Sequence, residues 1–239
     1  MSTLFISDLH LSQDRPDITK LFIYFLQNIA PGASALYILG DLFEVWLGDD
    51  MVLPDYQAPI AAIKQLSQQG TPVYVMYGNR DFLMQTEFEK MSGAQIIYEP
   101  YIIDLYGTRT LLLHGDTLCT DDTEYQKFRA MVRDPQWQAS MLAKPPQERL
   151  AMAKKLREIS KSETAQKATD IMDVNQGTVE SSMRSQHVLQ LIHGHTHRPA
   201  EHQFTLDGQA ARRIVLADWY KSGSYLSVDE RGFTSIALS

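Results

Sequence analysis

The sequence has almost no cysteine, since Cys119 is the only one in 239 residues. A single cysteine cannot form an intrachain disulfide, so the fold depends on its core and a reducing compartment is expected. No stretch reaches the roughly 18 consecutive apolar residues of a membrane-spanning helix. The segment Met1–Asp8 has neither basic charge nor a long apolar run, so no secretory signal is expected. These absences predict a cytoplasmic protein, with attachment to a membrane surface left open.

Positive charge is also scarce. Against 29 Asp and Glu there are 22 Lys and Arg, and the formal net charge of −7 argues against a general nucleic-acid-binding protein. What is present is an ordinary globular composition, with 44% hydrophobic and 21% charged residues. The length suits one large domain, or one domain plus an insertion, with a core of its own.

Six short apolar runs predict buried strands, at Thr3–Ile6, Ala35–Leu39, Val73–Tyr77, Thr110–Leu113, Val188–Ile192 and Ile214–Ala217. Between the first three runs lie segments with helical spacing of apolar residues, Ile18–Ile29 and Ile60–Leu66. This alternation of strands and helices predicts βαβ units around a largely parallel sheet.

The region from Asp121 to Gln186 differs from the rest. It contains no strand-like run and its pattern is that of several helices, interrupted at Pro135 and at Pro145–Pro146. Residues 125–168 include ten Lys or Arg and four Asp or Glu, a local charge of +6. We expect a helical insertion (residues 121–186) between two parts of one core, residues 1–120 and 187–239. Charge alone does not distinguish a binding surface from a solvated helical face.

Side chains able to bind metals follow five of the apolar runs. They are Asp8 and His10, Asp41, Asn79, His114, and His195 with His197. In open α/β sheets, ligands bind at the carboxyl ends of the strands, where these side chains are expected to lie. Each short motif occurs by chance and an isolated histidine is usually an ordinary surface or core residue. Five motifs repeated at one sheet edge nevertheless predict a metal site.

The ligand types limit the metal. Two carboxylates, one amide and four imidazoles suit Mn²⁺, Fe²⁺, Zn²⁺ or Co²⁺, and no thiolate is present. Seven ligands are too many for one ion and suit two, with Asp41 the best placed to bridge them. Two ions roughly 3.5–4 Å apart can activate water and stabilise both oxygens of an in-line displacement. The pattern therefore predicts hydrolysis of a phosphate ester or anhydride.

In order and spacing, the motifs Asp-x-His, Gly-Asp, Gly-Asn-x-Asp, His-Gly and Gly-His-x-His resemble those of the calcineurin-like metallophosphoesterases, over residues 1–120 and 187–220. The resemblance implies an α/β fold (an α+β sandwich) of two mixed β-sheets flanked by helices. It also implies two sets of metal ligands. One set is Asp8, His10, Asp41 and His197, and the other is Asp41, Asn79, His114 and His195.

One position departs from the family pattern. The family usually has histidine after the asparagine of its third motif, as a general acid or phosphate contact, whereas this sequence has Arg80. Arginine cannot serve as a general acid, but it binds phosphate oxygens well. A leaving group that needs no proton, such as a phosphate monoester, fits that change, so Arg80 favours pyrophosphates over simple phosphodiesters. We expect Arg80 and His195 to be catalytic.

Longer stretches narrow the resemblance to the branch of the family that hydrolyses UDP-2,3-diacylglucosamine in lipid A synthesis. They cover residues 38–50, 78–82, 114–122, 171–175 and 193–199. The branch implies attack on the α-phosphorus, with UMP and 2,3-diacylglucosamine 1-phosphate as products and two Mn²⁺ ions as cofactor. It also implies peripheral attachment to the cytoplasmic face of the inner membrane. No nucleic acid and no obligate protein partner are expected.

The resemblance makes the insertion a lid that receives the two acyl chains of this amphipathic substrate. Apolar residues suited to that role are Tyr125, Phe128, Met131, Met141, Met152 and Leu156. They suit the core of a small helical bundle equally well. The substrate contacts carried over are Asn79, Arg80, Asp122, Ser160, Thr164, Lys167 and His195, although the family commonly has asparagine at position 164. Tyr125 and Arg157 are further candidates.

Three other histidines match no ligand position. His187 and His202 are expected at the surface, and His193 beside the ligands rather than among them. The main alternative activity is a phosphodiesterase or pyrophosphatase acting on a soluble nucleotide, which needs no acyl-binding lid. A binding module on a degenerate scaffold of this family should have lost ligands, whereas all seven are present.

Overall fold

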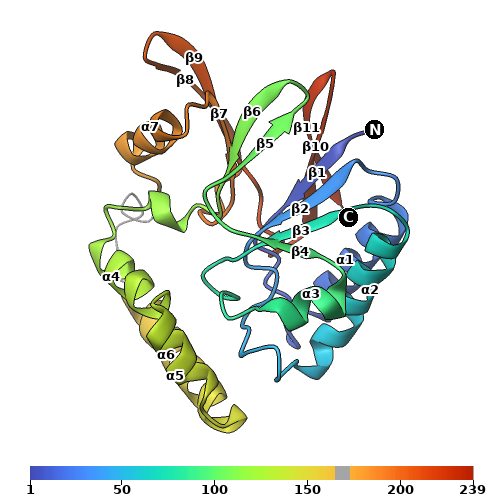
Figure 1. Cartoon of the computed structure of the whole chain (residues 1–239), viewed down its shortest axis with the longest axis vertical. Helices are drawn as coiled ribbons and strands as arrows, with labels where there is room; N and C mark the ends of the chain where they lie inside the picture. Colours follow the sequence, from blue (N-terminus) through green and yellow to red (C-terminus); the bar gives the residue numbers. More distant parts are fainter. Residues whose placement is uncertain (165–172, 239) are drawn as a thin grey trace.

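The computed structural model describes residues 1–164 and 173–238, with the backbone alone for residues 159–164. Two β-sheets pack against each other, and helices lie on their outer sides (Figure 1). The six-stranded sheet has the order β11-β10-β1-β2-β3-β4. Its strands are β1 (Thr3–Ile6), β2 (Ala35–Leu39), β3 (Val73–Met76), β4 (Gln95–Ile97), β10 (Gly223–Asp229) and β11 (Gly232–Leu238). Strands β1 to β4 are parallel, and β10 is antiparallel to β1.

The five-stranded sheet has the order β5-β6-β7-β9-β8. Its strands are β5 (Tyr101–Leu105), β6 (Thr108–Leu112), β7 (Gln190–His193), β8 (Ala200–Leu206) and β9 (Gln209–Val215). Strands β6, β7 and β9 are parallel, whereas β5 and β8 are antiparallel edges. The expected sandwich of two mixed sheets is therefore confirmed.

The strands of the first sheet are buried on both faces because side chains alternate between the faces. In β1, Leu4 and Ile6 pack toward the helices, whereas Phe5 points toward the second sheet. Phe5 shares the layer between the sheets with Leu112 of β6 and Ile192 of β7. Such a strand is a continuous apolar run rather than an alternating one, which is the pattern that the sequence shows.

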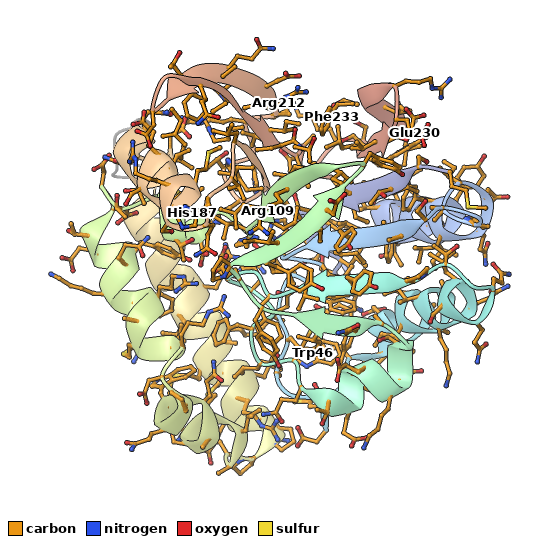
Figure 2. All side chains as sticks on the ribbon, turned by 45° about the horizontal axis from the view of Figure 1, so that its top comes forward. Trp46, Arg109, His187, Arg212, Glu230 and Phe233 are labelled. Carbon is orange, nitrogen blue, oxygen red and sulfur yellow. The ribbon has the colours of Figure 1, made fainter. Side chains whose placement is uncertain are left out.

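Three helices cover the outer face of the first sheet: α1 (Pro16–Asn28), α2 (Gln57–Gln68) and α3 (Thr86–Ser92). Two short 3₁₀ helices are η1 (Pro54–Tyr56) and η2 (Asp116–Leu118). The two sheets also touch near the amino-terminal ends of β1 and β7. There, Arg212 Cζ of β9 lies 4.7 Å from the ring centroid of Phe233 on β11 (Figure 2).

The region predicted to be an insertion (residues 121–186) contains α4 (Thr123–Val132), α5 (Pro135–Leu142), α6 (Pro146–Thr164) and α7 (Gln176–Ser185). Helices α4 to α6 form a group apart from α1 to α3 (Figure 1). The predicted interruptions at Pro135 and Pro145–Pro146 are confirmed, since α5 and α6 each begin at a proline. Met141 of α5 belongs to the same apolar core as the buried residues of α1 to α3. The role of this region as a lid stays a prediction.

Strands β1 and β2 match the predicted ranges, β3 ends one residue earlier, and β6 and β7 differ by one or two residues at both ends. The run Ile214–Ala217 marks only the last two residues of β9. Five strands were not predicted: β4, β5, β8, β10 and β11. Several of these have polar, exposed positions and are joined by tight hairpins, such as the turn at Asp207–Gly208 with φ of 50° and 79°.

Candidate metal centre and its adjoining cavity

All seven predicted ligands come together at the carboxyl edge of the two sheets. Asp8, His10, Asp41 and Asn79 follow β1, β2 and β3 of the six-stranded sheet. The other three, His114, His195 and His197, follow β6 and β7 of the five-stranded sheet. The ligand set is thus drawn from both sheets. Among the described residues, the closely spaced groups are Asp8 with His10 and His197, and Asp8 with Asp41 and His114.

The first half of the centre is built around Asp8. Its Oδ1 lies 3.3 Å from His197 Nε2 and 4.0 Å from His10 Nε2. The two imidazole Nε2 atoms are 3.4 Å apart, and His10 Nε2 is 3.7 Å from Asp41 Oδ2. Four ligand atoms therefore surround one small volume, and Asp8 Oδ1 has no hydrogen-bond partner among the described residues.

The second half shares Asp41 with the first. Asp41 Oδ1 lies 3.9 Å from His114 Nε2, while its other oxygen faces His10. Asn79 Oδ1 is 3.1 Å from His114 Nε2 and 3.0 Å from His195 Nδ1. One carboxylate oxygen thus faces each half, which is the arrangement that the bridging role predicted for Asp41 requires.

The backbone of these loops is strained. Five of the seven ligands have φ in the left-handed region: Asp8 (55°), His10 (49°), Asp41 (52°), His195 (69°) and His197 (55°). Non-glycine residues rarely adopt this conformation, and such strain concentrates at functional sites. At Gly78 and Gly194 the backbone lies so close to a ligand side chain that there is no room for a Cβ atom. A Cβ on Gly78 would lie 1.9 Å from Asp41 Oδ1, and one on Gly194 would lie 2.3 Å from Asp8 Oδ2.

The convergence of acceptor atoms fits a cation. His114 Nδ1 donates to the carbonyl oxygen of Leu39 at 2.9 Å, so in the neutral ring Nε2 carries a lone pair. That lone pair faces the Asn79 carbonyl oxygen at 3.1 Å. Two acceptors at this distance repel each other unless a proton or a metal ion lies between them. The residues present therefore fit divalent metal ions.

In the metal-free protein the pKa shifts favour a proton on His114, which a bound metal ion would displace. Burial opposes a charge on His114, but the carboxylates of Asp41, Asp116 and Asp8 outweigh it and raise its pKa to about 9. Burial raises the pKa of Asp41 to about 7. Burial also lowers the pKa of His10 to about 3 and that of His195 to about 4, which keeps both rings neutral and able to bind a metal.

Several residues that the sequence analysis did not single out support the ligands. Ser7 Oγ donates to Asp8 Oδ2 at 2.6 Å. Asp81, within the Gly-Asn-x-Asp motif, accepts from the backbone of Gly78 at 2.7 Å and of Leu42 at 2.8 Å, which joins two ligand loops. The ring of Tyr220 stacks on that of His10 at 5.3 Å. Asp81 could have been found from its motif, whereas no local pattern marks Ser7 or Tyr220.

The other histidines lie where the sequence analysis expected them. His187 and His202 are exposed (Figure 2 shows His187 beside α7). His193 is buried, with Nδ1 2.9 Å from the Gly194 carbonyl oxygen and Nε2 3.1 Å from Arg213 Nη1. Burial and the Arg213 charge lower its pKa to about 3, so Nδ1 donates and Nε2 accepts from Arg213. His193 therefore lies beside the metal ligands and is not in either ligand group.

An apolar cavity adjoins the metal centre, between the core and helices α4 to α6. Its lining comes from the loops after β2 and β3 and from the insertion: Glu44, Val45, Trp46, Leu47, Asn79, Arg80, Phe82, Leu83, Tyr125, Phe128, Trp137, Met141, Leu150, Ala153, Lys154, Leu156 and Arg157. Asn79 belongs to both the metal centre and the cavity. Arg80 lies at the same junction, and its Nε is buried without a hydrogen-bond partner among the described residues.

One predicted substrate contact, His195, lies in the metal centre, and the others fall into three groups. Asn79, Arg80 and the further candidates Tyr125 and Arg157 line the cavity. The Tyr125 ring lies 5.9 Å from that of His195, and its hydroxyl donates to Asp116 Oδ2 at 2.8 Å. Asp122 caps α4 by accepting from the Tyr125 backbone at 3.0 Å and is not part of the cavity lining. The remaining three, Ser160, Thr164 and Lys167, lie outside the described side chains.

Comparison with known proteins defines the class. The family model for calcineurin-like phosphoesterases matches residues 1–199. The chain belongs to the calcineurin-like phosphoesterase family, whose members depend on metals, and it is a hydrolase. Among solved structures, an archaeal phosphodiesterase superposes with a TM-score of 0.51 at 14% identity, over 100% of both chains, which shows the shared fold.

Two relatives with high sequence identity have a more specific name than the family. A protein of Stenotrophomonas maltophilia (strain K279a) is 50% identical over 100% of this chain and 99% of its own length. One of Aeromonas salmonicida (strain A449) is 52% identical over 95% of this chain and 89% of its own length. Both are named UDP-2,3-diacylglucosamine hydrolase.

Proposed function

We propose that this chain hydrolyses the pyrophosphate bond of UDP-2,3-diacylglucosamine by attack on the α-phosphorus. The products would be UMP and 2,3-diacylglucosamine 1-phosphate, and the cofactor two Mn²⁺ ions. The names of relatives at about 50% identity over nearly the whole chain support this substrate. The choice of Mn²⁺ rests on the resemblance described above and on a donor set of oxygen and imidazole nitrogen without thiolate.

The observation that carries the proposal is the junction between the metal centre and the apolar cavity. A substrate with a pyrophosphate and two acyl chains needs a polar reaction site and an apolar surface side by side. Asn79 and Arg80 lie where the two meet, while Leu150, Leu156 and Phe128 line the cavity farther along the insertion. A soluble nucleotide would leave that apolar surface exposed to water, which is unfavourable.

Each group has a role in this proposal. Asp8, His10, Asp41 and His197 would hold one ion, and Asp41, Asn79, His114 and His195 the other. Bound ions of this kind activate water and neutralise charge that develops on phosphate oxygens. Arg80 would bind the phosphate oxygens bidentately, since its guanidinium carries a fixed charge beside the centre. Because it cannot donate a proton under these conditions, the leaving group must depart without one, as a phosphate monoester does.

The surroundings of the substrate are part of the same proposal. The insertion (residues 121–186) would act as a lid over the acyl chains, and the enzyme would attach peripherally to the cytoplasmic face of the inner membrane. In the part of the chain that the structure describes, no helix has the length and hydrophobicity to cross a bilayer. Met131 and Met152 are exposed on α4 and α6, near the basic side chains of this region, and suit contact with an anionic lipid surface. The proposal requires neither nucleic acid nor an obligate protein partner.

A product assay tests the proposal directly. Purified protein with Mn²⁺ is given UDP-2,3-diacylglucosamine in detergent micelles, and in parallel UDP-glucose, in water labelled with ¹⁸O. We expect Mn²⁺-dependent release of labelled UMP from the acylated substrate alone. Label in the sugar phosphate instead of UMP would place the attack on the other phosphorus. Equal cleavage of both substrates would remove the lipid assignment and favour a soluble-nucleotide pyrophosphatase.

A further inference from the structure

Glu44 is a buried carboxylate between the metal centre and the helical insertion. Its Oε2 lies 3.5 Å from His10 Nδ1, and its Oε1 lies 3.0 Å from Arg157 Nη1 on α6. The Glu44 side chain is 9% exposed, whereas that of Arg157 is 47% exposed. Since the two contacts use different oxygens, one carboxylate makes both at once.

The contact with His10 lies on the side of the ring that faces away from the other ligands. His10 Nε2 points toward Asp41 Oδ2, and Nδ1 is buried with no hydrogen-bond partner among the described residues. Histidines that bind a metal through one nitrogen almost always donate the N–H of the other to a carboxylate, a carbonyl or water. Glu44 is placed to accept that hydrogen bond after a small rotation.

The backbone holds Glu44 and His10 in register. The segments after β1 and β2 run side by side beyond the ends of the strands. His10 N donates to Asp41 O at 2.9 Å, Leu11 N to Leu42 O at 3.0 Å, and Glu44 N to Leu11 O at 3.0 Å. A lone parallel bridge joins Leu11 and Phe43. These backbone hydrogen bonds therefore fix the position of the Glu44 carboxylate next to His10.

The contact with Arg157 reaches a helix that has another ion pair with the core. Arg149, earlier in α6, pairs with Asp50 and donates to the Leu47 carbonyl oxygen at 2.7 Å. That pair does not involve a metal ligand. Of the two pairs, only the one between Arg157 and Glu44 connects α6 to the metal centre, which makes the Asp50 pair a natural control.

We propose that Glu44 is a positioning residue that couples occupancy of the metal centre to attachment of α6. A metal ion on His10 Nε2 fixes the proton on Nδ1 and orders the Glu44 carboxylate, which then holds Arg157 and the helix that closes the cavity. Coupling of this kind is reciprocal, so a detached α6 weakens metal binding by the same factor. The inference rests on the metal centre of the proposed function and not on its substrate.

The experiment uses the full chain without substrate. Mn²⁺ affinity is measured by electron paramagnetic resonance titration, and amide hydrogen exchange is followed over residues 150–158 with and without Mn²⁺. In the wild type we expect Mn²⁺ to slow exchange in α6. Glu44→Gln should weaken Mn²⁺ binding by about tenfold. It should also make α6 exchange roughly threefold faster and insensitive to Mn²⁺.

Two further variants separate coupling from loss of folding. Arg157→Met changes a half-exposed residue, and it should also make exchange in α6 insensitive to Mn²⁺. Asp50→Asn should speed exchange in α6 both with and without Mn²⁺, and Mn²⁺ should still slow it. Because α6 stays attached in most molecules of this variant, its Mn²⁺ affinity should stay close to that of the wild type. Wild-type Mn²⁺ affinity in Glu44→Gln, or Mn²⁺ protection of α6 in Arg157→Met as in the wild type, would overturn the inference. Failure of the wild type itself to bind Mn²⁺ would instead overturn the metal centre of the proposed function.

Discussion

Replacing Asp41 with asparagine should have opposite effects on the metal-loaded and the metal-free protein. Asp41 is 2% exposed, and its oxygens face His10 at 3.7 Å and His114 at 3.9 Å. In the loaded protein the substitution removes the shared negative charge from both ligand sets. We expect loss of both ions and a fall in turnover of about a thousandfold or more, since both roles of the metals depend on this carboxylate.

In the metal-free protein the same charge is unfavourable. Burial raises the pKa of Asp41 from its ordinary 3.8 to about 7, so the folded state resists ionisation. Stability is therefore lost as the pH rises from near 4 through 7, where the unfolded chain is already ionised. Above pH 7 the penalty approaches about 4 kcal/mol, at about 1.4 kcal/mol for each pH unit. The Asp41→Asn variant lacks this penalty, and asparagine still accepts from the Arg80 backbone, as Asp41 Oδ1 does at 2.9 Å.

The assay is denaturant unfolding in chelator at pH 5 and pH 8, together with metal analysis of the loaded protein. We expect metal-free Asp41→Asn to gain stability over the wild type, by more at pH 8 than at pH 5, and to bind less than one ion per chain. Two ions per chain with normal turnover would refute the bridging role of Asp41. A variant less stable than the wild type at pH 8 would refute the argument from burial.

Other predictions test the remaining parts of the site. Arg80→Ala should lower kcat/KM for the pyrophosphate by about a hundredfold, equivalent to roughly 3 kcal/mol, with unchanged metal content by elemental analysis; loss of metal would make Arg80 structural. Leu156→Glu, in the cavity lining, should raise KM for the acylated substrate tenfold or more, while Ala151→Glu on the exposed side of the same helix should change it less than threefold; equal effects would remove the cavity from substrate binding. Gly78→Ala should abolish Mn²⁺ binding in an electron paramagnetic resonance titration, because its Cβ would lie 1.9 Å from Asp41 Oδ1. Gly70→Ala meets nothing within 4 Å but has a φ of 94°, so it should lower the free energy of unfolding by about 1 kcal/mol and bind Mn²⁺ normally.

The ligands were predictable because each one directly follows an apolar strand. Asp8 and Asp41 are two residues beyond β1 and β2, and His195 is two residues beyond β7, so strand prediction alone places them at one edge. Glu44 and Tyr220 were not predictable in this way. Backbone hydrogen bonds between the segments after β1 and β2 bring Glu44 to His10, and Tyr220 reaches the same ring by stacking on it from a distant loop. Neither contact is indicated by an apolar run that ends directly before the residue. The edge strands were missed for a related reason, since β8 is largely exposed and lacks an apolar run.

The origin of the ligands in both sheets has a mechanical consequence. Asp8 and Asp41 leave the six-stranded sheet and His114 and His197 leave the five-stranded one, so bound ions would fasten the two layers together at one edge. Separation of the layers would then require breaking coordination bonds as well as exposing the apolar interior. The metal-loaded protein should therefore unfold more slowly than the metal-free protein and resist proteases for longer.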